Sequence, residues 1–201
     1  MIAVHAGVDG TLRVDGDDDA AEVAFVDADW IPEGHEGPVP CIPAGDAAAA
    51  AGRLLASARH IVSLVADTPG PVEVGGEGLI ARSVRAALTD RPDGAESPFA
   101  VVDCSGDPAY LLDAIGRVSD LGLIVLAGEP LGRPFSIDLY VDVHRRGLRL
   151  AGAPRPDTLT PVEDPAAVER ALAELAEATP GEPPPRGAAW YSVAGASGRR
   201  A

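Results

Sequence analysis

Lysine is absent from this sequence of 201 residues, and all 16 of its basic residues are arginine. The absence excludes chemistry that depends on a lysine, such as a P-loop phosphate site or a Schiff base. Cysteine is scarce, and Cys41 and Cys104 supply neither a disulfide framework nor a four-thiolate zinc site. Aromatic residues make up only 4% of the chain, so Ala, Val, Leu and Ile must build the core.

Long apolar runs are also missing. No run approaches the roughly 20 residues that span a bilayer, and the N-terminus lacks the basic and apolar parts of a signal peptide. We therefore expect a cytoplasmic protein without a membrane partner. The net charge of -15 repels polyanions, so we expect no nucleic-acid partner either. A hydrophobic content of 46% suffices for one core and a small appendage.

The order of predicted elements divides the chain into three parts. Residues 1–45 read as a short β-rich segment, with strands at 2–5, 11–14 and 22–26 followed by a Pro/Gly-rich connector. In residues 46–179 helices and strands alternate: a helix from Asp46, a strand at 71–74, a helix at 79–88, a strand at 97–106, a helix at 107–120, strands at 121–128 and 145–153, and a helix at 164–178. Residues 180–201 read as an extended or disordered Pro/Gly-rich tail, with Trp190 and Tyr191 as a docking point.

This alternation predicts an α/β, Rossmann-like fold: a mainly parallel sheet with helices on both faces, and ligands at the carboxyl ends of the strands. Gly76, Gly78 and Ala81 fit the phosphate-binding pattern G-x-G-x-x-G/A between a strand and a helix. Two features oppose phosphate binding. Glu77 places a carboxylate in the turn, and the usual ribose-binding acid falls in a loop, so Asp103 is the better-placed substitute. A purely structural strand–turn–helix remains the alternative.

Residues 102–152, with "VDCSGDP", "LGLIVLAG" and "GLRLAG", resemble the end of the nucleotide domain of medium-chain, zinc-type alcohol dehydrogenases. "GHEG" at 34–37 is similar to a motif of the same family. The resemblance implies NAD or NADP as cofactor, with Gly106 and Gly128 flanking the nicotinamide. It also implies a homodimer through the edge strand at Gly147–Gly152.

The chain departs from this family in being much shorter. Two strands of the nucleotide fold, expected between Leu88 and Phe99, are missing, as is most of the catalytic domain, of which residues 1–45 would be a remnant. The zinc site lacks its first thiolate, because no Cys precedes His35, and Cys41 follows at a spacing that the motif does not use. We therefore expect no bound zinc.

Four residues are candidates for acid–base or nucleophilic work: Asp103, Cys104, His35 and His144. Core packing is the alternative for Cys104, and a solvated edge is the alternative for His144. Three functions follow: a compact, zinc-independent NAD(P)-dependent oxidoreductase acting on a small molecule, such as a secondary metabolite; a degenerate scaffold reassigned to a non-redox biosynthetic reaction; or a non-catalytic partner protein.

Overall fold

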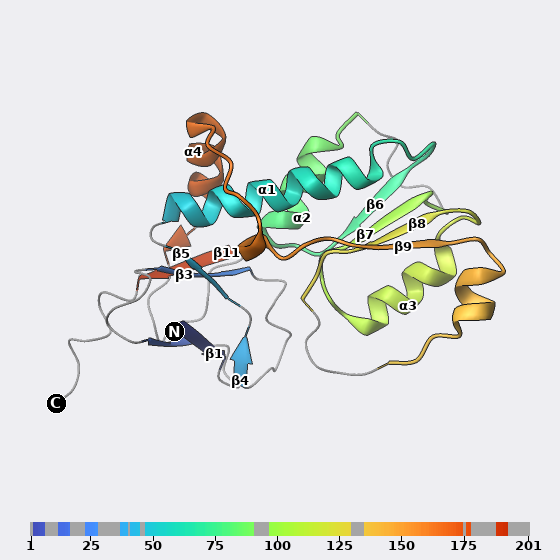
Figure 1. Cartoon of the computed structure of the whole chain (residues 1–201), viewed down its shortest axis with the longest axis horizontal. Coiled ribbons are helices and arrows are strands. Elements are labelled where there is room, and N and C mark those ends of the chain that lie inside the picture. Colours follow the sequence, from blue (N-terminus) through green and yellow to red (C-terminus); the bar gives the residue numbers. More distant parts are fainter. Residues whose placement is uncertain are drawn as a thin grey trace.

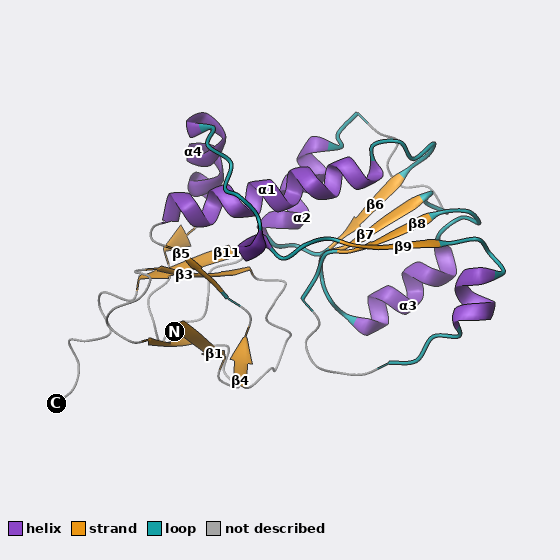
Figure 2. Ribbon diagram, viewed as in Figure 1, coloured by secondary structure: helices purple, strands orange, loops and turns teal. Residues whose placement is uncertain are grey.

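The structure is a computed structural model that describes residues 2–6, 12–16, 23–27, 37–39, 41–44, 47–90, 97–129, 135–174, 176–177 and 188–192. Its larger part is built on one four-stranded parallel sheet (Figures 1 and 2). The strands lie in chain order: β6 (Val72–Gly75), β7 (Ala100–Asp103), β8 (Leu123–Leu126) and β9 (Arg149–Gly152). The three predicted strands and the predicted edge strand are thus confirmed: β6 is shifted by one residue from its predicted range, and the other three are shorter than predicted.

Helices cover both faces of this sheet (Figure 1). Because successive residues of a strand point to opposite faces, Val102 and Val125 pack beneath α1 (Ala47–Val65) and α2 (Leu79–Ala87). Val101 and Ile124 pack instead against α3 (Pro108–Arg117). The Rossmann-like α/β class predicted from the sequence is confirmed.

The connection through α2 has the opposite hand to the next two connections. The chain moves across the sheet in one direction from β6 to β9, yet α2 lies on one face while α3 and the one-turn helix η2 (Leu139–His144) pack on the other. Crossovers between parallel strands are right-handed in about 98% of cases. The β6–α2–β7 connection is therefore the exception. A complete doubly wound sheet has the strand order 3-2-1-4-5-6, in which β6 corresponds to strand 1 and β7 to strand 4. There the chain passes from strand 1 to strands 2 and 3 before it reaches strand 4, so the exceptional connection does not occur.

Open crevices form at the carboxyl edge of such a sheet where adjacent strands send the chain to opposite faces. The chain leaves β6 toward the face of α2 and leaves β7 toward the face of α3. The ends of β6 and β7 therefore keep the topology of such a switch point, although no described strand pairs with β6 on its other side.

The described residues also form two smaller sheets. One contains β2 (Leu12–Gly16), β1 (Ile2–Ala6) and β4 (Gly37–Val39), and the other contains β10 (Ala176–Glu177), β11 (Ala188–Ser192), β3 (Val23–Asp27) and β5 (Ile42–Ala44). The three predicted N-terminal strands are confirmed to within two residues.

Three sequence-based expectations are corrected here. The Pro/Gly-rich connector contains two strands, β4 and β5, and the C-terminal tail contributes β11, which pairs antiparallel with β3. The last helix, α4 (Pro165–Glu174), is shorter than predicted, and β10 follows it. All three differences arise from pairing between segments far apart in the chain, which local composition does not report.

The helix η2 was not expected from the sequence. Asp138 nucleates it, because its Oδ1 accepts hydrogen bonds from the backbone N–H groups of Tyr140 and Val141, each at 3.0 Å. No described helix combines the length and the apolar character that crossing a membrane requires.

Candidate functional site

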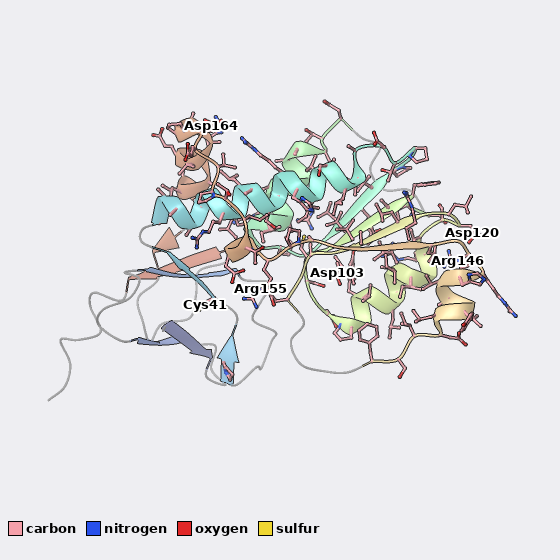
Figure 3. All side chains as sticks on the ribbon, in the orientation of Figure 1. Cys41, Asp103, Asp120, Arg146, Arg155 and Asp164 are labelled. Atoms are coloured by element: carbon pink, nitrogen blue, oxygen red, sulfur yellow. The ribbon has the colours of Figure 1, made fainter. Side chains whose placement is uncertain are left out.

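The carboxyl edge of the main sheet brings together four loops, one after each strand. Asp103 and Arg155 lie at this end of the sheet, whereas Asp120 and Arg146 lie at the other end (Figure 3). Backbone hydrogen bonds tie the loops to one another: Ala127 and Gly128 donate to the carbonyl of Asp103 at 2.8 Å, and Ala153 donates to that of Leu126 at 2.8 Å. The edge is thus a connected surface on which a ligand can contact several loops.

The predicted glycine turn lies at the end of β6, between this strand and α2. Gly76 has a φ of 103°, a left-handed conformation that favours glycine. Gly78 is the N-cap of α2, and Ala81 is fully buried, so a larger side chain would separate helix and sheet. The side chain of Glu77 is 88% exposed and lies 3.7 Å from Arg85. Its carboxylate therefore points to solvent and does not block the turn.

Arg82 is the cation nearest to this turn in sequence, one residue beyond Ala81 in the first turn of α2. Its Nε and Nη2 atoms are buried and have no hydrogen-bond partner among the described residues. Leaving a buried donor unsatisfied costs about 1–3 kcal/mol, and more for a charged group. An anion bound beside the first turn of α2 would supply the missing acceptors. Arg82 could not be singled out from the sequence, because an isolated arginine in a helix carries no local signal.

Asp103 ends β7 as predicted, but its carboxylate is engaged within its own loop. Its Oδ1 accepts hydrogen bonds from Ser105 N at 2.9 Å, Ser105 Oγ at 2.7 Å and Gly106 N at 3.2 Å. Burial raises the pKa of the Asp103 carboxyl above its ordinary value of 3.8, although these hydrogen bonds act in the opposite direction. Asp103 thus shapes the β7–α3 loop, and its role as a ribose ligand stays a prediction.

Gly106 and Gly128, the glycines predicted to flank a nicotinamide, pack backbone against backbone. A Cβ atom on Gly106, whose φ is 65°, would lie 2.2 Å from the carbonyl oxygen of Glu129. A Cβ on Gly128 would lie 2.2 Å from the backbone nitrogen of Gly106. Both positions therefore need glycine for the fold itself, whether or not a ligand binds.

A pocket of about 250 Å³ opens between the loops that follow β8 and β9. Its walls are Ala127, Gly128, Glu129, Ala153, Pro154, Arg155 and Pro156. Arg155 Nε lies 3.2 Å from Glu129 and 3.4 Å from Asp157, and the Glu129 side chain is only 17% exposed. The pocket thus combines apolar walls with one ion pair. Sequence reasoning missed this pair; its only local signal is that each residue follows the glycine at the end of a strand by a few positions.

On the α3 face, Tyr110 covers the end of β6. A Cβ atom on Gly75 would lie 2.2 Å from Cζ of the Tyr110 ring, so the ring packs directly on the strand backbone. The Tyr110 hydroxyl donates to Glu73 at 2.8 Å, and Arg117 donates to the same carboxylate at 2.6 and 2.8 Å. Burial and the neighbouring Glu73 raise the pKa of Tyr110, so the phenol stays protonated at neutral pH.

We expect the Glu73–Arg117 pair to contribute to stability in a pH-dependent way. The hydrogen bonds from Arg117 hold the pKa of Glu73 below its ordinary value of 4.5. A lowered folded-state pKa stabilises the fold above the unfolded-state value, and that stabilisation is lost as pH falls through the folded-state value. Glu73→Gln should therefore lower the free energy of unfolding by about 1–2 kcal/mol at pH 7, a figure reduced for partial exposure.

Urea denaturation from pH 3 to pH 7 measures this effect, and the difference from wild type should shrink below about pH 4.5. Asp113→Asn is the control, because Asp113 also contacts Arg117 at 2.6 Å but its side chain is 62% exposed. If the loss of unfolding free energy in Glu73→Gln stays constant down to pH 3, the ion-pair interpretation is wrong.

The remaining catalytic candidates do not join Asp103 in one constellation. The thiol of Cys104 belongs to the core beneath α1 and α2 with 3% exposure, which matches its packing alternative. His144 does not lie at the carboxyl edge, where acid–base work was expected of it. It precedes β9 and lies at the amino ends of the strands, where its exposed ring contacts Tyr140. His35 lies outside the described residues. Cys41 packs against the core.

Among the described residues, no group of three or more His, Cys, Asp or Glu side chains is placed to hold a metal ion. The motif at 34–37 falls mostly outside those residues, so the structure leaves the expectation of no bound zinc untested.

The fold is similar to several solved structures, among them proteins described as dehydrogenases. A protein of Sinorhizobium meliloti described as a zinc-binding dehydrogenase, with NADP bound, aligns with a TM-score of 0.50 and 14% identity, over 77% of this chain and 62% of that one. S. aureus TarJ aligns with a TM-score of 0.51 and 13% identity, over 96% of this chain and 99% of that one. This chain thus has a Rossmann-like α/β fold that is similar to the folds of these two proteins.

At these identities the likeness concerns the fold, and it agrees with the resemblance seen in the sequence. L-idonate 5-dehydrogenase from Escherichia coli aligns with a TM-score of 0.49 and 14% identity, over 80% of this chain. The chain spans 64% of the length of that enzyme and 62% of the S. meliloti protein. No protein-family model matches the sequence, and no curated protein sequence is significantly similar to it.

Proposed function

We propose that the protein is a compact, zinc-independent oxidoreductase that binds a nicotinamide nucleotide, NAD or NADP in the family it resembles, and acts on a small molecule such as a secondary metabolite. One observation carries this proposal: the glycine turn with Arg82 and the 250 Å³ pocket share the carboxyl edge of one sheet. Ligands of open α/β sheets bind at this edge. The S. meliloti protein of similar fold has NADP bound.

The turn and the first helical residues fit a phosphate group. Gly76 and Gly78 have no side chains, so a phosphate can approach their backbone closely. Arg82 brings a positive charge and two buried nitrogens that lack acceptors. Because Glu77 points to solvent, these groups would hold the phosphate without a carboxylate inside the turn.

The pocket after β8 and β9 fits a flat ring. Ala127, Ala153 and Pro154 supply apolar walls that would exclude water from the ring. A nicotinamide bound at this position would supply hydride chemistry. Arg155, 53% exposed and oriented by Glu129, is the cationic donor at the pocket, and it would hydrogen-bond an oxygen atom of the substrate.

A fluorescence titration with NADH and NADPH tests the proposed function. We expect binding in the micromolar range, lost in Gly78→Val, because a side chain there would fill the space beside the helix N-terminus. Circular dichroism must show that the variant is folded. If neither nucleotide binds to folded wild-type protein, the oxidoreductase proposal is wrong, and a reassigned or non-catalytic scaffold takes its place.

We also propose that the protein forms a homodimer through the edge strand at Gly147–Gly152. The proposal is supported by the position of β9 at the edge of the sheet and by the exposure of Leu150. Unpaired edge strands are templates for pairing with another chain. Analytical ultracentrifugation at micromolar concentration should give twice the chain mass of 20.5 kDa, and a monomer mass would contradict the proposal.

A further inference from the structure

We infer that the site recognises only the nicotinamide mononucleotide half of a dinucleotide and makes no specific contacts with an adenosine half. This inference rests on the proposed nicotinamide site. It changes the ligand class from a dinucleotide to a mononucleotide: one phosphate, one ribose and one nicotinamide ring.

The first observation concerns the open edge of β6. In a doubly wound fold the strand next to strand 1 carries the acidic residue that binds the adenosine ribose, about 20 residues after the glycine turn. In this sheet β6 pairs with β7 alone among the described strands. Pro71 and Gly75 accept hydrogen bonds from the β7 side, so the carbonyl of Val74 faces the opposite, open side.

Arg85 occupies this open edge. Its Nη2 atom donates to the carbonyl oxygen of Val74 at 2.9 Å and also to that of Gly76. These are acceptors that the N–H groups of an added strand would use. A cationic side chain on a strand edge is a common means of preventing further pairing. The edge is thus closed by a side chain at the place where the adenosine-binding strand would begin.

Chain length leads to the same conclusion. Helix α2 ends at Ala87 and β7 begins at Ala100, which leaves the 12 residues 88–99 between them. A single crossover between parallel strands takes about a dozen residues or more. The intervening chain is therefore too short to form an additional parallel strand together with the crossovers that would enter and leave it.

The retained parts match the dimensions of a mononucleotide. Two strand spacings separate β6 from β8, or about 10 Å, and one ribose joins a phosphate to a ring over a span of that order. The pocket at the far end holds about 250 Å³. Pockets for drug-sized ligands begin at about 300 Å³, so this pocket accommodates a ring and little more.

Parallel titrations of the full-length protein with reduced nicotinamide mononucleotide, NADH and NADPH test the inference. We expect the mononucleotide to bind within tenfold of NADH, and 5′-AMP not to displace it. If NADH or NADPH binds at least tenfold more tightly than the mononucleotide, or if 5′-AMP displaces the mononucleotide, the inference is overturned and the proposed function stands. If no reduced nucleotide binds, the proposed function fails, and the inference fails with it.

A phosphate-free ligand separates the two halves of the site. Reduced nicotinamide riboside should bind at least tenfold more weakly than the mononucleotide, because it lacks the group that the glycine turn and Arg82 would hold. Arg85→Ala serves as the matched variant: it opens the β6 edge, and its loss of the hydrogen bond to Gly76 O affects a turn that the mononucleotide and NADH would share. Its ratio of mononucleotide to NADH affinity should stay within threefold of wild type. Equal binding of riboside and mononucleotide would overturn the phosphate assignment.

Discussion

We expect Gly106→Ala to lower the free energy of unfolding by about 2–5 kcal/mol. A left-handed φ costs a residue with a Cβ roughly 1–2 kcal/mol, and the φ of Gly106 is 65°. The added methyl group would also lie 2.2 Å from the carbonyl oxygen of Glu129. Backbone on both sides prevents relief by a simple side-chain rotation, so the two loops must separate.

Gly116→Ala is the matched control, because a Cβ at Gly116 in α3 meets nothing within 4 Å. It should raise stability by about 0.5–1 kcal/mol, the usual gain for replacing a helical glycine by alanine. Urea denaturation followed by circular dichroism measures both variants. Equal stability of Gly106→Ala and wild type would show that the loops after β7 and β8 do not pack as the structure has them.

This prediction also bears on ligand binding. Gly106 N donates to Asp103 Oδ1, and Asp103 in turn accepts the backbone bonds of Ala127 and Gly128 with its carbonyl oxygen. Displacing Gly106 therefore disturbs the loops after β7 and β8. Gly106→Ala should weaken nucleotide binding even under conditions where the variant stays folded, whereas Gly116→Ala should leave it unchanged.

The main sheet was predictable because its elements carry strong local signals. Apolar runs such as 123–126 mark buried parallel strands. Asp107 and Pro108 predict the start of α3 by N-capping chemistry, and Asp107 does accept the hydrogen bond of Ala109 N at 2.9 Å. The glycine turn at Gly76 was predictable for the same reason: a strand, a conformational requirement and a helix follow one another within a few residues.

The rest depends on contacts between distant residues. β4 and β11 exist as strands because β1 and β3 pair with them. His144 comes shortly before β9, so the parallel topology places it at the amino ends of the strands, opposite the carboxyl edge. Arg85 and Arg155 matter only because the fold brings them to a free strand edge and to Glu129. No spacing pattern in the sequence reports such meetings.

The second large effect is expected at Arg82, where stability and binding should change in opposite directions. Replacing Arg82 by Met keeps an unbranched side chain but removes two buried donors that lack partners in the described structure. Relief of that desolvation should raise the free energy of unfolding of the ligand-free protein by about 1–3 kcal/mol. The same substitution removes the charged donors that we propose hold the phosphate. Charge-assisted hydrogen bonds contribute roughly 1.5–3 kcal/mol, so affinity for the reduced mononucleotide should fall about 10- to 100-fold.

Arg59→Met is the control. The side chain of Arg59 is 61% exposed, and it forms a surface ion pair with Asp164 at 3.8 Å. Surface pairs contribute at most about 1 kcal/mol, so this variant should change neither quantity much. Thermal denaturation with and without ligand, together with the titration, gives both numbers for each variant. Loss of stability in Arg82→Met with unchanged affinity would mean that the guanidinium serves the fold and not a ligand. A gain in stability together with a loss of affinity is the signature of a site that keeps an unsatisfied charge for its ligand.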